Sequence, residues 1–209
     1  MSLKRFSNQI EVGCDEAGRG CLAGPVIAAA VILPLNFKNK ELNDSKKLSA
    51  KKREELSQII KKHALAYEVG IVNPVKIDEI NILNSSILAM HKAINKINIK
   101  YEILLIDGPY FKSYKNYNHE CIIRGDSEFQ AIAAASIIAK TYRDRLMSKI
   151  HEDFPIYNWL SNKGYPTKEH RKAIEKIGCH QNGPLPGQRI GRLSNVCHGN
   201  KNCAKEGIG

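Results

Sequence analysis

The chain lacks any cysteine pattern that would form a disulfide framework or a regular metal site. Its six cysteines include no C-x-x-C pair, and Cys14 and Cys121 lie in apolar runs typical of strands. We therefore expect reduced thiols in a cytoplasmic protein. Cys197, His198 and Cys203 are spaced too irregularly to indicate a zinc site.

Long apolar runs are also missing. The longest, residues 22–35, is interrupted by Gly24 and Pro25 and is too short to cross a bilayer, and residues 1–13 have no apolar signal core. The sequence thus predicts no membrane association. Its 209 residues suffice for one domain with a substantial core.

Acidic residues are scarce relative to basic ones. Lysine and arginine number 32 against 21 aspartate and glutamate, which gives a net charge of +11. This excess favours a polyanionic partner, with nucleic acid as the first candidate. Solvated surface lysines are the simpler alternative, because charge alone identifies no partner.

Short apolar runs alternate with amphipathic stretches along most of the chain. Strands are predicted at residues 10–15, 25–33, 64–72, 101–108 and 121–126, and helices at residues 48–62, 74–97 and 127–150. The alternation indicates one α/β domain over residues 1–177, with a basic helical region from about residue 145. Residues 178–209 are rich in glycine and proline, which predicts a loosely ordered tail.

The predicted helix at residues 127–150 has two further features. Ser127 and Gln130 have the spacing of a capping box at its start. Its many alanines would let it lie close against the sheet.

Three predicted strands end in acidic residues, namely Asp15 with Glu16, then Asp107, then Asp126. If these strands are parallel and adjacent, their carboxyl ends bring four carboxylates to one edge of the sheet. Carboxylates so close together need cations, and Mg²⁺ or Mn²⁺ prefer oxygen ligands. Two such ions about 4 Å apart would clamp the attacking and leaving oxygens of a phosphodiester. The pattern predicts metal-dependent phosphodiester hydrolysis.

Each acid taken alone has a simpler interpretation, because aspartate is common in turns and at helix N-termini. Asp144 is a rival for the fourth position. On a helix continuous from Ser127, with a rise of about 1.5 Å per residue, it would lie about 25 Å from Asp126. We therefore select Asp126 and interpret Asp144 as an ion-pair partner of Arg143 and Arg145.

Several motifs then occur in a characteristic order. They are DEAGRG at residues 15–20, LAGPV at 22–26, NDSKKL at 43–48, LIDG at 105–108, GDS at 125–127, AASIIAK at 134–140, and GYPT at 164–167 followed by His170. From about residue 10 to residue 175 the chain resembles bacterial ribonuclease HII, a type 2 ribonuclease H. The resemblance implies a ribonuclease H-like fold, a mixed central sheet flanked by helices with a C-terminal helical region.

The resemblance also implies an activity. It is endonucleolytic cleavage of the RNA strand of RNA/DNA hybrids, and of single ribonucleotides embedded in duplex DNA, leaving 3′-hydroxyl and 5′-phosphate ends. Asp15, Glu16, Asp107 and Asp126 match the family's catalytic carboxylates, which hold Mg²⁺ or Mn²⁺. A monomer is expected, and a sliding-clamp partner is left open.

Substrate-binding residues are implied by the same match. Gly18, Arg19 and Gly20 correspond to the motif that senses the 2′-hydroxyl, and glycine lets backbone groups approach that hydroxyl closely. Tyr165 corresponds to the tyrosine that stacks on the adjacent DNA sugar.

Lys46 and Lys47 are further candidates, as contacts to phosphate, although a solvated loop explains them nearly as well.

The chain departs from the family pattern at three places. Cys21 replaces the usual proline, which predicts a softer turn and an exposed thiol near the metal ions. Residues 158–162 differ from the usual glycine and histidine, and the usual ending is replaced after Gly178. These departures bring the C-terminal substrate contacts into question.

Two other functions fit the sequence less well. A non-catalytic nucleic-acid-binding module would gain nothing from four acids that repel phosphates. A DNA-cutting nuclease of the same superfold, such as a junction resolvase, would have no 2′-hydroxyl to read with its Gly-Arg-Gly motif.

Overall fold

A computed structural model describes residues 3–178 of the chain. Its strands are β1 (Glu11–Ala17), β2 (Val26–Ile32), β3 (Ala66–Val72), β4 (Ile103–Asp107) and β5 (Asn118–Ile122). Its helices are α1 (Ala50–His63), α2 (Pro74–Ile94), α3 (Gln130–Asp153), α4 (Trp159–Asn162) and α5 (Lys168–Ile177), with short 3₁₀ turns η1 (Gly125–Ser127) and η2 (Pro155–Tyr157). The predicted tail, apart from Gly178, lies outside the described residues.

The strands form one mixed sheet in the order β3-β2-β1-β4-β5. Strand β1 is antiparallel to β2 and parallel to β4, and β4 is parallel to β5. The predicted α/β fold class is therefore confirmed. The three strands that precede the acidic residues are also parallel neighbours, which was the condition for their carboxyl ends to meet.

The chain divides into two compact units. The first comprises Met1–Ala17, Ile27–Ile71 and Ser86–Tyr142, and so contains nearly the whole sheet. The second comprises Gly18–Val26, Val72–Ser85 and the chain from Arg143 onward. Among the described residues, no helix is long and apolar enough to span a membrane.

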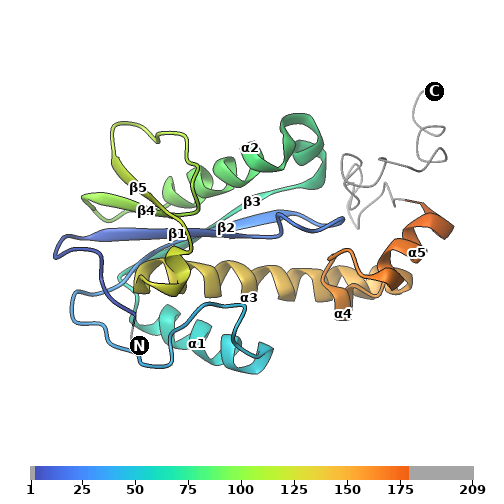
Figure 1. Cartoon of the computed structure of the whole chain (residues 1–209), viewed down its shortest axis with the longest axis horizontal. Helices are drawn as coiled ribbons and strands as arrows, with labels where there is room; N and C mark the ends of the chain where they lie inside the picture. The colour runs from blue at the N-terminus through green and yellow to red at the C-terminus, as the bar shows by residue number, and fades with distance from the viewer. Residues whose placement is uncertain (1–2, 179–209) are drawn as a thin grey trace. The chain divides into compact units, whose positions relative to one another are not determined.

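Within the first unit, α1 and the first part of α3 cover one face of the sheet, and the later part of α2 covers the other (Figure 1). Alanines of α3 are buried in the core between α3 and the sheet, as predicted. The approach is closest at Gly13, where a Cβ would lie 2.1 Å from the carbonyl carbon of Ala131. Glycine in a strand commonly marks such a close backbone approach.

The structure corrects the predicted start of α3. The helix begins at Gln130, because residues 125–127 form the 3₁₀ turn η1 instead. No capping box forms. The Ser127 hydroxyl donates to the carbonyl of Arg124 (2.8 Å), and the Gln130 side-chain amide donates to the carbonyl of Leu3 (2.7 Å).

Two other boundaries differ from prediction. Strand β5 covers Asn118–Ile122 rather than residues 121–126, so Asp126 follows a turn in which Arg124 has a left-handed backbone. Helix α2 kinks at Asn81, where φ is 64°. The Asn81 side chain accepts a hydrogen bond from the backbone N–H of Asn84 (3.0 Å), so it caps the second half of the helix.

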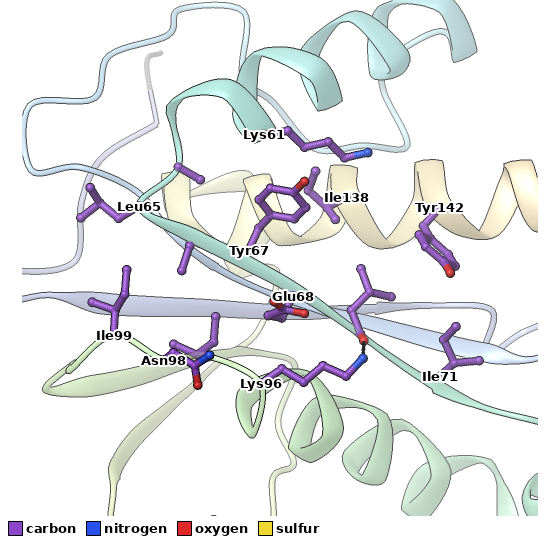
Figure 2. A pocket seen from close by; sticks show the side chains of 14 residues that line it. Lys61, Leu65, Tyr67, Glu68, Ile71, Lys96, Asn98, Ile99, Ile138 and Tyr142 are labelled. Carbon is purple, nitrogen blue, oxygen red and sulfur yellow. Dashed lines mark hydrogen bonds between the residues drawn. The ribbon is translucent and has the colours of Figure 1, made fainter.

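A groove of about 790 Å³ follows the edge strand β3 (Figure 2). Tyr67 and Tyr142 line it, and the Lys61 ammonium lies 6.0 Å from the Tyr67 ring centroid. Two lysine ammonium groups from outside this strand donate hydrogen bonds to its carbonyls, Lys96 to Val69 (2.7 Å) and Lys92 of α2 to Ile71 (3.1 Å). Edge-strand carbonyls that already accept hydrogen bonds are less available to a further strand from another molecule.

Candidate active site

Three carboxylates meet beside the parallel strands of the first unit. Asp15 lies near the end of β1, Asp107 ends β4, and Asp126 lies in η1 after β5. One carboxylate oxygen from each lies within 4.8 Å of the other two. The structure thus brings together three of the four predicted acids, and it selects Asp126 as the member contributed after β5.

Burial governs the electrostatics of this cluster. It raises the pKa of Asp15 well above its usual range, and the neighbouring charges of Glu16 and Asp107 raise it further. Burial also raises the pKa of Asp107, against the hydrogen bond that its Oδ1 accepts from the Gly125 N–H (2.8 Å). For Asp126, burial and then the charge of Asp107 raise the pKa. The three groups together disfavour full ionisation unless a cation is present.

The cluster has the properties of a divalent-cation site. Its donors are all carboxylate oxygens, the ligands that Mg²⁺ and Mn²⁺ prefer. The buried Oδ2 of Asp126 accepts no hydrogen bond, and it forms an ion pair with the exposed Lys46 ammonium at 3.6 Å. An exposed ammonium offsets only part of the cost of burying this charge, so a cation bound among the carboxylates would stabilise it further. The residues present therefore fit a hard divalent ion.

Glu16 lies apart from the other three acids. Side chains alternate along a strand, so adjacent Asp15 and Glu16 point to opposite faces of β1. The backbone N–H of Glu16 donates to Asp15 Oδ1 (2.6 Å), and its charge contributes to the raised pKa of Asp15. Its carboxylate is not among the three whose oxygens meet within 4.8 Å, but its charge acts on that cluster.

Lys46 and Lys47 lie in the segment that precedes α1. The Lys46 ammonium reaches Asp126, as described, while 77% of its side chain remains exposed. The Lys47 side chain is exposed. Lys46 is therefore the better supported of the two as a neighbour of the carboxylate cluster.

The predicted Gly-Arg-Gly motif belongs to the second unit. Gly18 is buried with φ of +105°, and a Cβ there would lie 2.4 Å from Nε of Arg143. Arg19 and Gly20 are exposed, and a Cβ at Gly20 would make an ordinary 3.9 Å contact with the Tyr165 ring. Gly18 thus serves the loop backbone, whereas Gly20 and Tyr165 form an adjacent exposed pair.

Arg143 organises this loop, a role that the sequence did not reveal. It is fully buried, and its guanidinium donates to three carbonyls, those of Ala23 (2.9 Å), Pro25 (3.0 Å) and Lys163 (2.7 Å). One side chain therefore joins the segment after the Gly-Arg-Gly motif to the turn that carries Tyr165. An arginine between a tyrosine and an aspartate gives little sequence signal for such a buried position.

The turn around Tyr165 has a second support. His170 Nδ1–H donates to the carbonyl of Tyr165 (2.8 Å), and its Nε2 accepts a hydrogen bond from the Trp159 indole (2.9 Å). Burial lowers the pKa of His170. A neutral imidazole is required if Nε2 is to accept from the indole. The unusual Trp159 is therefore a buried part of this support.

The expectation that Cys21 has an exposed thiol is wrong. Cys21 is fully buried, and its thiol donates to the carbonyl of Lys163 (3.8 Å). Cys14 and Cys121 are also free thiols, as expected. Burial protects the thiols of Cys14 and Cys21 from reagents in solvent.

Comparison with known proteins agrees with this arrangement. The sequence model of the family described as Ribonuclease HII matches residues 12–188. A ribonuclease HII of Christiangramia forsetii is 58% identical over 177 residues, covering 84% of this chain and 89% of that protein. A ribonuclease HII of Phocaeicola vulgatus is 57% identical over 169 residues, covering 81% of this chain and 84% of that protein.

Solved structures are similar in fold. Ribonuclease H2 from Pyrococcus horikoshii has a TM-score of 0.71 at 26% identity, covering 88% of this chain and 92% of that one. Ribonuclease HII of Archaeoglobus fulgidus, solved in complex with PCNA, has a TM-score of 0.64 at 28% identity, covering 80% and 86%. Bst-RNase HIII in complex with Mn²⁺ has a TM-score of 0.69 at 18% identity, covering 92% of this chain and 69% of that one.

Proposed function

This chain belongs to the ribonuclease HII family, and on that premise we propose that Asp15, Asp107 and Asp126, assisted by Glu16, hold the divalent cations of its active site. The protein is a metal-dependent endoribonuclease that acts on RNA/DNA hybrids. The observation that carries the residue assignment is the meeting of three buried or half-buried carboxylates within 4.8 Å.

A bound divalent ion supplies a polarised phosphoryl oxygen and an activated water at neutral pH. The chain's own contribution is to hold the carboxylates in place, through β1, β4 and η1. Asp126 offers an oxygen with no competing hydrogen bond. Attack by water rather than by the 2′-hydroxyl leaves 3′-hydroxyl and 5′-phosphate ends.

Substrate contacts are proposed for the exposed residues. Lys46 and Lys47 bind phosphates, with Lys46 favoured because it already contacts the carboxylate cluster. In the second unit, Arg19 and Gly20 read the 2′-hydroxyl, supported by Gly18, and Tyr165 stacks on the neighbouring sugar. The exposure of Gly20 and of the Tyr165 ring supports this assignment.

The test uses purified protein with Mg²⁺ or Mn²⁺ and three duplexes: an RNA/DNA hybrid, a DNA duplex with one ribonucleotide, and an all-DNA control. We expect cleavage of the first two and none of the third. Cleavage of all-DNA duplex would contradict reading of the 2′-hydroxyl. Binding of all three without cleavage would favour the binding module.

Asp107→Asn tests the carboxylate assignment. The variant keeps an oxygen that can accept the Gly125 hydrogen bond but loses the charge, so cleavage should be abolished while duplex binding persists. Asp153→Asn is the matched control, since Asp153 is an exposed acid at the end of α3, and it should cleave at the wild-type rate. Full turnover by Asp107→Asn would remove Asp107 from the metal site.

Four finer points also remain proposals. They are a two-metal arrangement, a choice of Mg²⁺ or Mn²⁺ in the cell, a monomeric state and a cytoplasmic location, the last supported by the free thiols. A sliding-clamp partner is supported by the Archaeoglobus protein having been solved with PCNA. Co-elution with a purified sliding clamp would test it.

A further inference from the structure

Two buried serines lie behind Asp15 in the first unit. Ser45 and Ser136 are 3% and 4% exposed, and their hydroxyl oxygens are 2.9 Å apart. Hydrogen bonding from the Ser136 side chain lowers the pKa of the Asp15 carboxyl, against the larger effect of burial. Ser45 comes from the segment before α1 and Ser136 from α3, so the contact joins parts of the chain 91 residues apart.

The chemistry of the groups fixes the direction of donation. An ionised carboxylate can only accept hydrogen bonds, so the Ser136 hydroxyl must donate to Asp15 when that residue is charged. A hydroxyl has one proton, so the Ser136 oxygen must then accept from Ser45. Ser45 thus donates to Ser136 and Ser136 donates to Asp15, so both hydroxyl protons are used in hydrogen bonds.

Ser45 is itself held firmly. Arg53 donates to the carbonyls of Ser45 (2.9 Å) and Leu48 (2.7 Å), and the Asp44 side chain accepts from the Lys46 N–H (2.8 Å). These bonds keep the Ser45 side chain buried while the Lys46 side chain extends to Asp126. The segment therefore reaches the carboxylate cluster directly through Lys46 and indirectly through the contact of Ser45 with Ser136.

We propose that Ser136 and Ser45 are positioning residues, a two-hydroxyl relay that orients the Asp15 carboxylate for cation binding and anchors the Lys46 segment to it. The inference rests on the proposed function of Asp15 as a metal ligand. A carboxylate's terminal torsion has a broad energy minimum, and Ser136 adds a second donor to the Glu16 N–H that already holds Asp15 Oδ1. Groups that hydrogen-bond to metal ligands typically contribute about 10–100-fold to metal affinity.

The experiment measures Mn²⁺ binding without substrate, from the electron paramagnetic resonance signal of free Mn²⁺. It compares the full-length wild type with Ser136→Ala, Ser45→Ala and the double variant. Ser57→Ala is the matched control, because Ser57 is fully buried in α1 of the same unit and its hydroxyl has no hydrogen-bond partner among the described residues. Thermal melting of each variant separates weakened binding from unfolding.

We expect Ser136→Ala to bind Mn²⁺ about 10-fold more weakly than wild type. Ser45→Ala should show a smaller loss in the same direction, and Ser57→Ala none. Because Ser45 acts through Ser136, adding Ser45→Ala to Ser136→Ala should cause no further loss. If Ser136→Ala does not fold, the Ser45→Ala measurement decides alone.

Two failures can be told apart. Wild-type Mn²⁺ affinity in the folded serine variants, or additive losses in the double variant, would overturn the relay and leave the metal site standing. Absence of Mn²⁺ binding by the wild type, or equal binding by Asp107→Asn, would instead overturn the proposed function.

Discussion

Two glycines of one motif place different demands on their surroundings. The backbone of Gly18 has a positive φ, and its missing Cβ leaves room for Arg143, whereas Gly20 has space for a methyl group. We predict that Gly18→Ala lowers the free energy of unfolding by about 1–3 kcal/mol, because its conformation is strained for alanine. Gly20→Ala should change it by less than about 0.5 kcal/mol.

The same pair separates folding from recognition. Urea denaturation measures the stability of both variants, and cleavage of the single-ribonucleotide duplex measures recognition. Gly20→Ala should lose cleavage despite its normal stability, since a methyl group obstructs approach to the 2′-hydroxyl. Normal cleavage by Gly20→Ala would remove that residue from the proposed contact.

Asp107 gives a prediction about pH. Burial raises its pKa above the usual 3.8, so between that value and the raised pKa the folded state binds more protons than the unfolded state. The stability contributed by this group is full at low pH and is lost as the pH rises through the raised pKa. In EDTA at pH 7, Asp107→Asn should therefore raise Tm by about 2–4 °C, equivalent to about 1 kcal/mol.

Melting curves across pH check the sign. The advantage of Asp107→Asn in EDTA should shrink as the pH falls through the raised pKa of Asp107, because the wild-type carboxyl then becomes protonated. Saturating Mn²⁺ should reverse the order, because it stabilises the wild type by binding the folded state. A variant less stable than wild type in EDTA would show that the cluster is not under charge repulsion.

The sequence predicted the carboxylates because each follows an apolar run that reads as a strand. It did not predict the groups that hold them. The contacts of Ser136 with Ser45 and of Arg143 with Ala23 join residues 91 and 120 positions apart, and no local pattern encodes such pairs. The sequence pattern therefore predicts the reacting carboxylates, whereas the side chains that hold the site in place can be identified only from the folded structure.

At the level of elements, one helix carries supports for both units. The Arg143 side chain projects from α3 and connects three carbonyls in the second unit, as described above. We predict that Arg143→Lys lowers the free energy of unfolding by about 3 kcal/mol, because one ammonium cannot replace the three bonds and leaves buried carbonyls unpaired. Urea denaturation measures this loss.

Arg145→Lys is the matched control for this prediction. It makes the same exchange two residues later at an exposed position, so it should be nearly neutral. Equal effects of the two substitutions would show that the buried bonds of Arg143 contribute little.

Most elements were predicted from periodicity, and the boundaries that failed have identifiable causes. The start of α3 shifted because Ser127 bonds backward to Arg124 rather than forward into the helix. The kink at Asn81 could not be predicted from the sequence, because no proline or glycine lies near it in the helix. Competing side-chain bonds of serine and asparagine decide such boundaries, and these depend on backbone angles that a sequence pattern does not contain.

At the scale of the whole molecule, the net charge of +11 means that binding to a nucleic acid should depend on salt concentration. We predict that binding of the inactive Asp107→Asn protein to hybrid duplex weakens linearly in a plot of log affinity against log salt. Adding Lys46→Ala should reduce the slope by about 1, the signature of one lost phosphate contact. Fluorescence anisotropy at several salt concentrations provides the measurement.

Lys61→Ala is the control, because Lys61 carries the same charge but lies in the groove along β3. It should leave the slope close to its original value. If both substitutions reduced the slope equally, the net positive charge of the protein would attract the duplex without a specific phosphate contact at Lys46.

The close approach at Gly13 limits how this protein can change over evolutionary time. A methyl group there would collide with the backbone carbon and oxygen of Ala131, not with its side chain. No replacement at position 131 could compensate, since every amino acid has the same backbone. A suppressor of a Gly13 substitution would have to displace the backbone of α3, and with it Ser136. We therefore expect that single substitutions cannot gradually change the distance between α3 and β1 on which Asp15 depends.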